Sequence, residues 1–153
     1  GKTIPEEFKG VLIIKFEDLI LKPYKDPNGM IAVGYGNTYY ENGDKVTKKD
    51  PAISPQRARE LLLFTLSTYE KYINSAIRSD INQNQYDALV SLCYDIGVNN
   101  LRNSKLMKTL NRDQNDPTLV TEFMRFSRLN NYASARQVYR RQLEHQLYFS
   151  WLK

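Results

Sequence analysis

Residues 24–38 read YKDPNGMIAVGYGNT, and this stretch predicts a tight β-hairpin. Its DPNG segment (26–29) is a turn signal, because proline presets φ and glycine accepts a positive φ. We expect strands over 22–26 and 30–34 on either side of that turn. An Asn-Gly pair at 42–43, between apolar or aromatic flanks, predicts a further hairpin turn. The N-terminal third therefore predicts a small antiparallel sheet of about three strands.

The rest of the chain shows helical periodicity. After the Ser54-Pro55 start signal, apolar residues recur every three or four positions and predict a long amphipathic helix over 55–78. Further helices are expected over 5–17, 82–96, 104–111, 117–127 and 134–152. These elements predict an α+β fold in a single domain, residues 1–153. A sheet lobe (about 18–50) and a helical lobe (about 55–153, with the N-terminal helix 5–17) would be joined by the long helix, with a cleft between them as the expected site.

Composition narrows the function classes. The chain has 153 residues, 41% hydrophobic and 25% charged, which is typical of a folded globular domain. Its net charge is +5 and its sequence pI is about 9.2, so a polyanionic partner is favoured. The basic residues are scattered and no nucleic-acid-reading motif occurs, so no nucleic-acid partner is expected. No run is long enough to cross a membrane, so no stable membrane insertion is expected, and no signal peptide is recognisable.

Cysteine and histidine content limits other chemistries. The chain has one cysteine, Cys93, and one histidine, His145, on different segments. A Cys–His nucleophile is therefore a weak interpretation, and an intrachain disulfide framework and the usual zinc clusters are excluded. We expect no metal and no organic cofactor, and a monomer.

Two acids attract attention beside the hairpin. Glu17 and Asp26 have the spacing Glu-x8-Asp, followed by the glycine-rich DPNG…VGYGNT pattern. A second block, residues 81–111, reads INQNQYDALVSLCYDIGVNNLRNSKLMKTLN. Together these motifs resemble the phage-type lysozyme (endolysin) family, glycoside hydrolase family 24, and the likeness extends from about residue 16 to residue 148. The resemblance implies a lysozyme-like fold and cleavage of bacterial peptidoglycan between N-acetylmuramic acid and N-acetylglucosamine, with inversion.

The residue chemistry agrees with this implication. Glu17, flanked by Phe16 and Leu19, fits a general acid, because apolar surroundings favour the protonated carboxyl group. Asp26, in a polar turn beside Lys25, fits the ionised partner that activates water or stabilises charge. An inverting pair is expected about 6.5–9.5 Å apart, which leaves room for a water molecule.

Several positions depart from the family pattern. The family's water-holding threonine position is Ala32, whose methyl group makes no hydrogen bond. Loss of that anchor predicts an activity lower by about tenfold to a thousandfold. Asp18 follows Glu17 where glycine is usual, Asp95 replaces an asparagine, and Phe126 replaces a tryptophan. By the resemblance, the predicted substrate-binding residues are Asn37, Gln85, Asp95, Phe126 and Arg140.

Three alternatives to a muramidase remain open at this stage. A lysozyme fold that binds glycan without cutting it fits Ala32, Asp18 and Phe126. Lytic transglycosylation also fits Ala32, because it needs an acid but no activated water. A nucleic-acid-binding helical domain rests on charge alone. Either wall-directed activity would place the protein in the periplasm or outside the cell.

Overall fold

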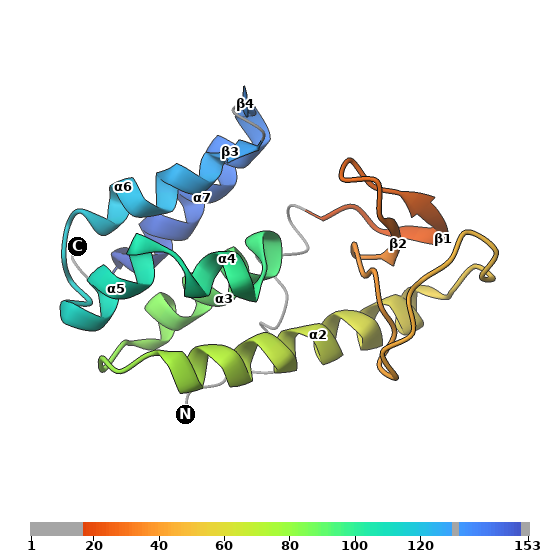
Figure 1. Ribbon diagram of the computed structural model, residues 1–153, viewed down its shortest axis with the longest axis horizontal. Coiled ribbons are helices and arrows are strands. Elements are labelled where there is room, and N and C mark those ends of the chain that lie inside the picture. The colour runs from red at the N-terminus through yellow and green to blue at the C-terminus, as the bar shows by residue number, and fades with distance from the viewer. Residues whose placement is uncertain (1–16, 130–131, 151–153) are drawn as a thin grey trace. The chain divides into compact units, whose positions relative to one another are not determined.

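The computed structural model describes residues 17–129 and 132–150 (Figure 1). Its described residues divide into two compact units, one formed by residues 17–68 and the other by residues from 69 onward. The boundary between the units falls inside the long helix rather than before it. The helix predicted over 5–17 lies outside the described residues except for Glu17, which stands in a bend.

The sheet in the first unit has two strands. β1 (Ile20–Lys25) pairs antiparallel with β2 (Ile31–Gly34), and Tyr24 is the register partner of Ala32. The prediction of a third strand was wrong. Beyond β2 the structure has only isolated bridges among residues 17–68, between Val33 and Asn37 and between Tyr39 and Lys45. The two glycines that follow Val33 explain this, because both have positive φ, 70° and 88°, and turn the chain before a ladder can extend.

The long helix α2 (Pro55–Ala76) closes the core of the first unit. Its first turn is capped by Ser54, whose hydroxyl accepts a hydrogen bond from the Arg57 amide at 3.0 Å. Buried side chains from the sheet, the following loop and the helix then pack together, namely Val33, Val46 and Leu61, with Ile31, Tyr40 and Ile53 around them. β2 comes close to the helix because Gly34 has no side chain: a Cβ there would lie 3.2 Å from the Cβ of Ala58.

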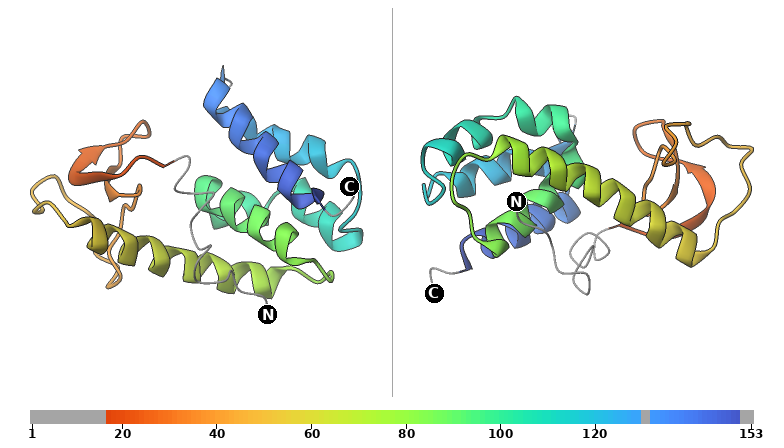
Figure 2. Two further views of the ribbon diagram at one scale, coloured as in Figure 1. Left: turned by 180° about the vertical axis from the view of Figure 1, so that it is seen from behind. Right: turned by 90° about the horizontal axis from the view of Figure 1, so that it is seen from below.

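The second unit is mainly helical. Its elements are α3 (Gln83–Ile96), α4 (Val98–Arg102), α5 (Lys105–Arg112), α6 (Leu119–Met124), the 3-10 turn η2 (Arg125–Ser127), β3 (Arg128–Leu129), β4 (Tyr132–Ala133) and α7 (Ala135–Tyr148). α3 and α7 lie side by side (Figure 2). α3 buries Leu89 and Leu92 completely, and Phe123 of α6 is equally buried. The core of this unit therefore lies around α3.

The helix predictions that fall on described residues are confirmed, with ends that differ by a few residues. The long helix ends at Ala76 instead of residue 78, and α3 ends before Gly97, whose φ is 84°. α4 was not predicted, and neither was the short β3–β4 hairpin. Within the described ranges, no helix is long and apolar enough to cross a lipid bilayer.

Candidate active site

Asp26 is positioned by the turn that joins β1 to β2. One carboxylate oxygen, Oδ1, accepts hydrogen bonds from the amides of Asn28 at 2.9 Å and Met30 at 2.8 Å. The Asp26 amide in turn donates to the carbonyl of Met30 at 2.7 Å. Among residues 17–129 and 132–150, no donor contacts the second oxygen, Oδ2. The turn thus fixes this half-buried carboxylate and leaves one oxygen open for chemistry.

Glu17 lies in the same unit, half-buried and just before β1. Its Oε2 atom lies close to Gly36, because a Cβ built on that glycine would be only 3.4 Å away. Gly36 has φ of 88°, a conformation that side chains other than glycine rarely adopt. The backbone conformation therefore favours glycine at this position, and a side chain there would make van der Waals contact with the Glu17 carboxylate.

Tyr24 lies near the two acids, and the sequence analysis missed it. Burial raises the pKa of the Tyr24 phenol, and the negative charges of Glu17, Asp26 and Asp18 raise it further. The phenol therefore stays protonated at neutral pH, and it is near enough to all three carboxylates for their charges to act on it. Its position two residues before Asp26 was the available signal, since alternate strand residues share a face.

Ala32 is completely buried at the centre of β2. Its methyl group stands opposite Tyr24 in the register of the sheet. The residue that lacks a hydroxyl therefore lies in the same hairpin as Asp26.

Asn37 is buried against α2. Its side-chain amide donates to the Thr65 hydroxyl at 2.7 Å and to the Leu61 carbonyl at 3.4 Å. Its Oδ1 atom is buried and accepts no hydrogen bond from the described residues. These bonds hold the loop after β2 on the helix, and substrate contact by Asn37 stays a prediction.

Gln85 is a capping residue of α3. Its side-chain oxygen accepts from the Asn82 amide at 2.9 Å, and the Asn82 side chain accepts from the Gln85 amide at 2.8 Å, which is a capping box. The Gln85 side chain is 2% exposed. The structure thus assigns it a role in helix initiation, and its predicted substrate contact remains a prediction.

Asp95 and Arg140 belong to a buried charge cluster between α3 and α7. Arg141 lies 3.0 Å from Asp95 and 2.7 Å from Glu144, while Arg140 lies 3.8 Å from Asp95 and 3.4 Å from Glu144. Glu144 also accepts a hydrogen bond from the Ser91 hydroxyl at 2.5 Å. Burial raises the pKa of Glu144, against the opposing effect of the two arginines.

The cluster gives a structural role to two predicted site residues, Asp95 and Arg140. Arg140 is 3% exposed and Arg141 and Glu144 are fully buried, whereas Asp95 retains a partly exposed side chain. Asp95 therefore supplies a charge that the arginines pair with, and Arg140 joins the two helices. The sequence analysis did not identify Glu144, although its spacing from Arg140 and Arg141 on one helix was the available signal.

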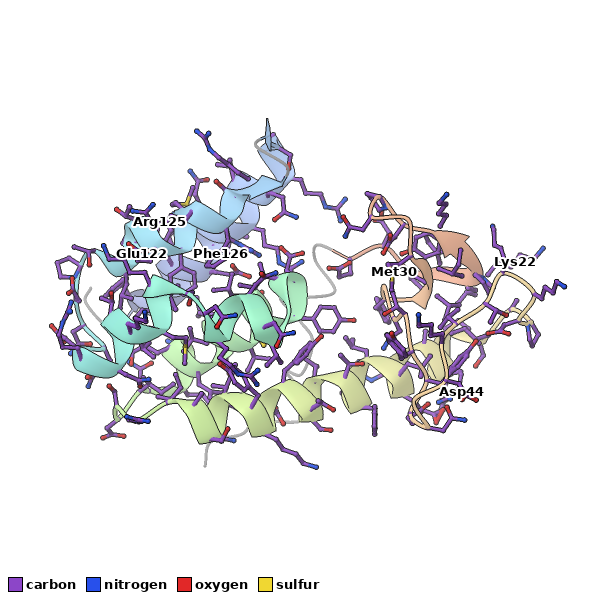
Figure 3. All side chains as sticks on the ribbon, in the orientation of Figure 1. Lys22, Met30, Asp44, Glu122, Arg125 and Phe126 are labelled. Atoms are coloured by element: carbon purple, nitrogen blue, oxygen red, sulfur yellow. The ribbon has the colours of Figure 1, made fainter. Side chains whose placement is uncertain are left out.

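Phe126 lies on η2, directly after α6 and close in sequence to Glu122 and Arg125 (Figure 3). Its side chain is half-buried in the helical unit.

Of the predicted site residues, Glu17, Asp26, Ala32 and Asn37 lie in the first unit. Gln85, Asp95, Phe126 and Arg140 lie in the second unit, and their place in one shared cleft stays a prediction.

No cluster of three or more potential metal-ligating side chains occurs within the described part of the chain. The arrangement that remains is two carboxylates and a neutral phenol beside a tight hairpin, on an α+β fold. Carboxylate pairs of this kind suit acid–base chemistry on glycosidic bonds.

Comparison with known proteins places this arrangement in a family. Residues 14–144 match the family model described as phage lysozyme. The chain belongs to the phage lysozyme family.

Individual relatives agree with this assignment. The chain is 34% identical over 122 residues to an endolysin of Acyrthosiphon pisum secondary endosymbiont phage 1. That alignment covers 78% of each protein. It is 37% identical over 91 residues to the endolysin of Salmonella phage P22, covering 60% of this chain but 62% of that endolysin, less than two thirds of its length. An endolysin structure from Escherichia coli O157:H7 phage FAHEc1 superposes with a TM-score of 0.82 at 26% identity, covering 97% of this chain and 94% of that one.

Proposed function

We propose that this protein is a muramidase that cleaves the glycan strand of bacterial peptidoglycan between N-acetylmuramic acid and N-acetylglucosamine. Glu17 donates a proton to the glycosidic oxygen, and Asp26 accepts a proton from the attacking water. Cleavage proceeds with inversion and needs no metal or organic cofactor. Membership of the phage lysozyme family supports the substrate class and the reaction.

The observation that carries this proposal is the fixed orientation of the Asp26 carboxylate. Two backbone amides hold Oδ1, so the carboxylate has a fixed direction. The remaining oxygen is the one that takes the proton from water.

Glu17 is suited to the complementary role. It lies in the same unit, half-buried, with its carboxylate packed near the backbone of Gly36. A general acid must hold its proton until the leaving oxygen needs it, and the Glu17 carboxyl group is the one we assign to that role. The charges of Asp18 and Asp26 lie close enough to affect the same phenol as Glu17 does.

The setting of the reaction follows from the substrate. Peptidoglycan lies outside the cytoplasmic membrane, so the enzyme acts in the periplasm or outside the cell. The net charge of +5 favours approach to an anionic wall. We propose that the protein acts as a monomer, since a single copy carries both carboxylates.

The test is digestion of purified peptidoglycan by the unchanged chain and by its Glu17→Gln variant, followed by turbidity and mass spectrometry. Products with reducing muramic-acid ends that depend on Glu17 are expected. The control is the thermal unfolding midpoint of the variant, which should match that of the unchanged protein. Retained cleavage by the variant would remove Glu17 from its role.

Ala32 motivates a second candidate, a glycan-binding module without hydrolysis. Its fully buried methyl group stands beside the hairpin acids and offers no hydrogen bond to water. In this case the unchanged chain and its Glu17→Gln variant would both bind peptidoglycan in a pull-down, and neither would release products. Anhydro-sugar ends in place of reducing ends would instead indicate lytic transglycosylation.

A further inference from the structure

Tyr24 and Asp26 share a face of the hairpin. Tyr24 is the Cα partner of Ala32 in the antiparallel register, and directly opposite residues in such a pair project to the same side. Asp26 is two residues further along, where the hairpin continues through the bond between its amide and the Met30 carbonyl. Alternation along a strand therefore places the Tyr24 and Asp26 side chains on one face, the face to which the Ala32 methyl also projects.

The Tyr24 hydroxyl is available for a new partner. Tyr24 is half-buried, and its hydroxyl makes no hydrogen bond to any residue within 17–129 or 132–150. A phenol offers one donor and acceptor lone pairs, and a half-buried phenol gains by using them. The nearby carboxylates and the burial keep it neutral, so its oxygen stays an acceptor and does not become a charged base.

The attacking water needs more than one anchor. A water molecule held only by Asp26 Oδ2 can rotate, and a misplaced nucleophile reacts far more slowly. A second acceptor fixes the water's other proton, which leaves a lone pair directed at the anomeric carbon. Ala32, whose side chain is an apolar methyl group, cannot supply that acceptor.

We propose that Tyr24 holds the attacking water, because this tyrosine shares the hairpin face with Asp26, is the register partner of Ala32, and has a hydroxyl that bonds to none of the described residues. This inference rests on the proposed muramidase function. In the step, the water oxygen bonds to the anomeric carbon as the glycosidic carbon–oxygen bond breaks. Asp26 takes one water proton and Glu17 gives its proton to the leaving oxygen. Tyr24 accepts a hydrogen bond from the second water proton and keeps its own proton throughout.

The first experiment removes only the hydroxyl, with the Tyr24→Phe variant assayed on purified soluble glycan strands. We expect kcat to fall by about tenfold to a thousandfold, comparable to loss of one orienting interaction, with KM changed less than about twofold. The matched control is Tyr39→Phe, which removes a hydroxyl from an exposed tyrosine of the same unit and should leave kcat unchanged. An unchanged kcat in Tyr24→Phe would overturn the inference.

The second experiment asks whether a hydroxyl at position 32 substitutes for the phenol. Ala32→Thr adds a methyl and a hydroxyl, and Ala32→Val adds nearly the same shape without the hydroxyl. We expect the loss caused by Tyr24→Phe to shrink at least threefold in the threonine background and to stay full in the valine background. Equal losses in both backgrounds would overturn the inference, because the two hydroxyls would then not serve the same water.

The two proposals fail in different ways. If the unchanged chain releases no Glu17-dependent products, the muramidase function fails and the role of Tyr24 falls with it. If such products are released and Tyr24→Phe cuts at the same rate, only the role of Tyr24 is wrong. A rise in KM with unchanged kcat would make Tyr24 a substrate contact and would also contradict water holding.

Discussion

The main-chain amide of Met30 and the Asp26 carboxylate are joined by a hydrogen bond of 2.8 Å across the turn between β1 and β2. The Asn28 amide binds the same carboxylate oxygen, so a local turn motif sets the orientation of the proposed base. Under the proposed function, aspartate at this position has two separable tasks: it stabilises the turn, and it presents an oxygen to water.

Substitution of Asp26 can separate these tasks. In Asp26→Asn, the side-chain oxygen still accepts from the two amides, but the group no longer takes a proton. We expect kcat to fall by about 10²- to 10⁴-fold, typical for loss of a general base, with a nearly unchanged unfolding midpoint. Asp26→Ala should lose both activity and about 1 kcal/mol of unfolding free energy. Urea unfolding and glycan-strand assays measure the two effects, and full activity in Asp26→Asn would contradict the assignment.

Gly36 offers a test of the space around Glu17. Gly36→Ala places a methyl 3.4 Å from Glu17 Oε2 on a backbone with φ of 88°. Gly43→Ala imposes a similar backbone strain, at φ of 90°, but meets nothing within 4 Å. Both variants should lose about 1 kcal/mol of stability, whereas only Gly36→Ala should lose activity at temperatures where both are folded. Equal activities of the two variants would show that the Glu17 contact is unimportant.

The buried cluster between α3 and α7 predicts a large stability effect. Glu144→Gln leaves the Ser91 hydrogen bond possible but removes the charge that both arginines face. Breaking a buried ion pair on one side costs about 3–5 kcal/mol, because the remaining charges stay buried. The control is Glu41→Gln, which breaks the partly exposed pair with Arg57 and should cost about 1 kcal/mol or less.

Urea unfolding of both variants, compared with the unchanged protein, gives these free energies directly. A loss below about 1 kcal/mol for Glu144→Gln would contradict the view that the cluster binds α7 to α3.

Asp50 gives stability a pH dependence with a defined sign. Hydrogen bonds from Thr47 and Tyr40 hold the pKa of Asp50 below its ordinary value. A carboxylate with a lowered folded pKa stabilises the protein above its unfolded pKa, and that stabilisation is lost as the pH falls through the folded pKa. The unfolding midpoint of Asp50→Asn should therefore lie below that of the unchanged protein at pH 7, and the difference should shrink below about pH 4. A difference that grows on acidification would contradict this linkage.

The sequence predicted much of the local structure for local reasons. The turn before β2, the cap at Ser54 and the helix periodicities all depend on residues within a few positions of one another. The prediction of a third strand was wrong because glycines with positive φ after Val33 turn the chain away. A count of strand-like residues cannot show this.

The roles of Glu17 and Asp26, and the missing hydroxyl at Ala32, were predicted from spacing and family likeness. What only the tertiary structure decided is which partner each side chain meets. Tyr24 acquires its significance from a register partner across the sheet, and Arg140 becomes buried because Glu144 lies one turn along α7 and Asp95 lies on α3. Burial and pairing depend on residues distant in sequence, so the sequence determined the elements and the acids, and packing determined their chemical surroundings.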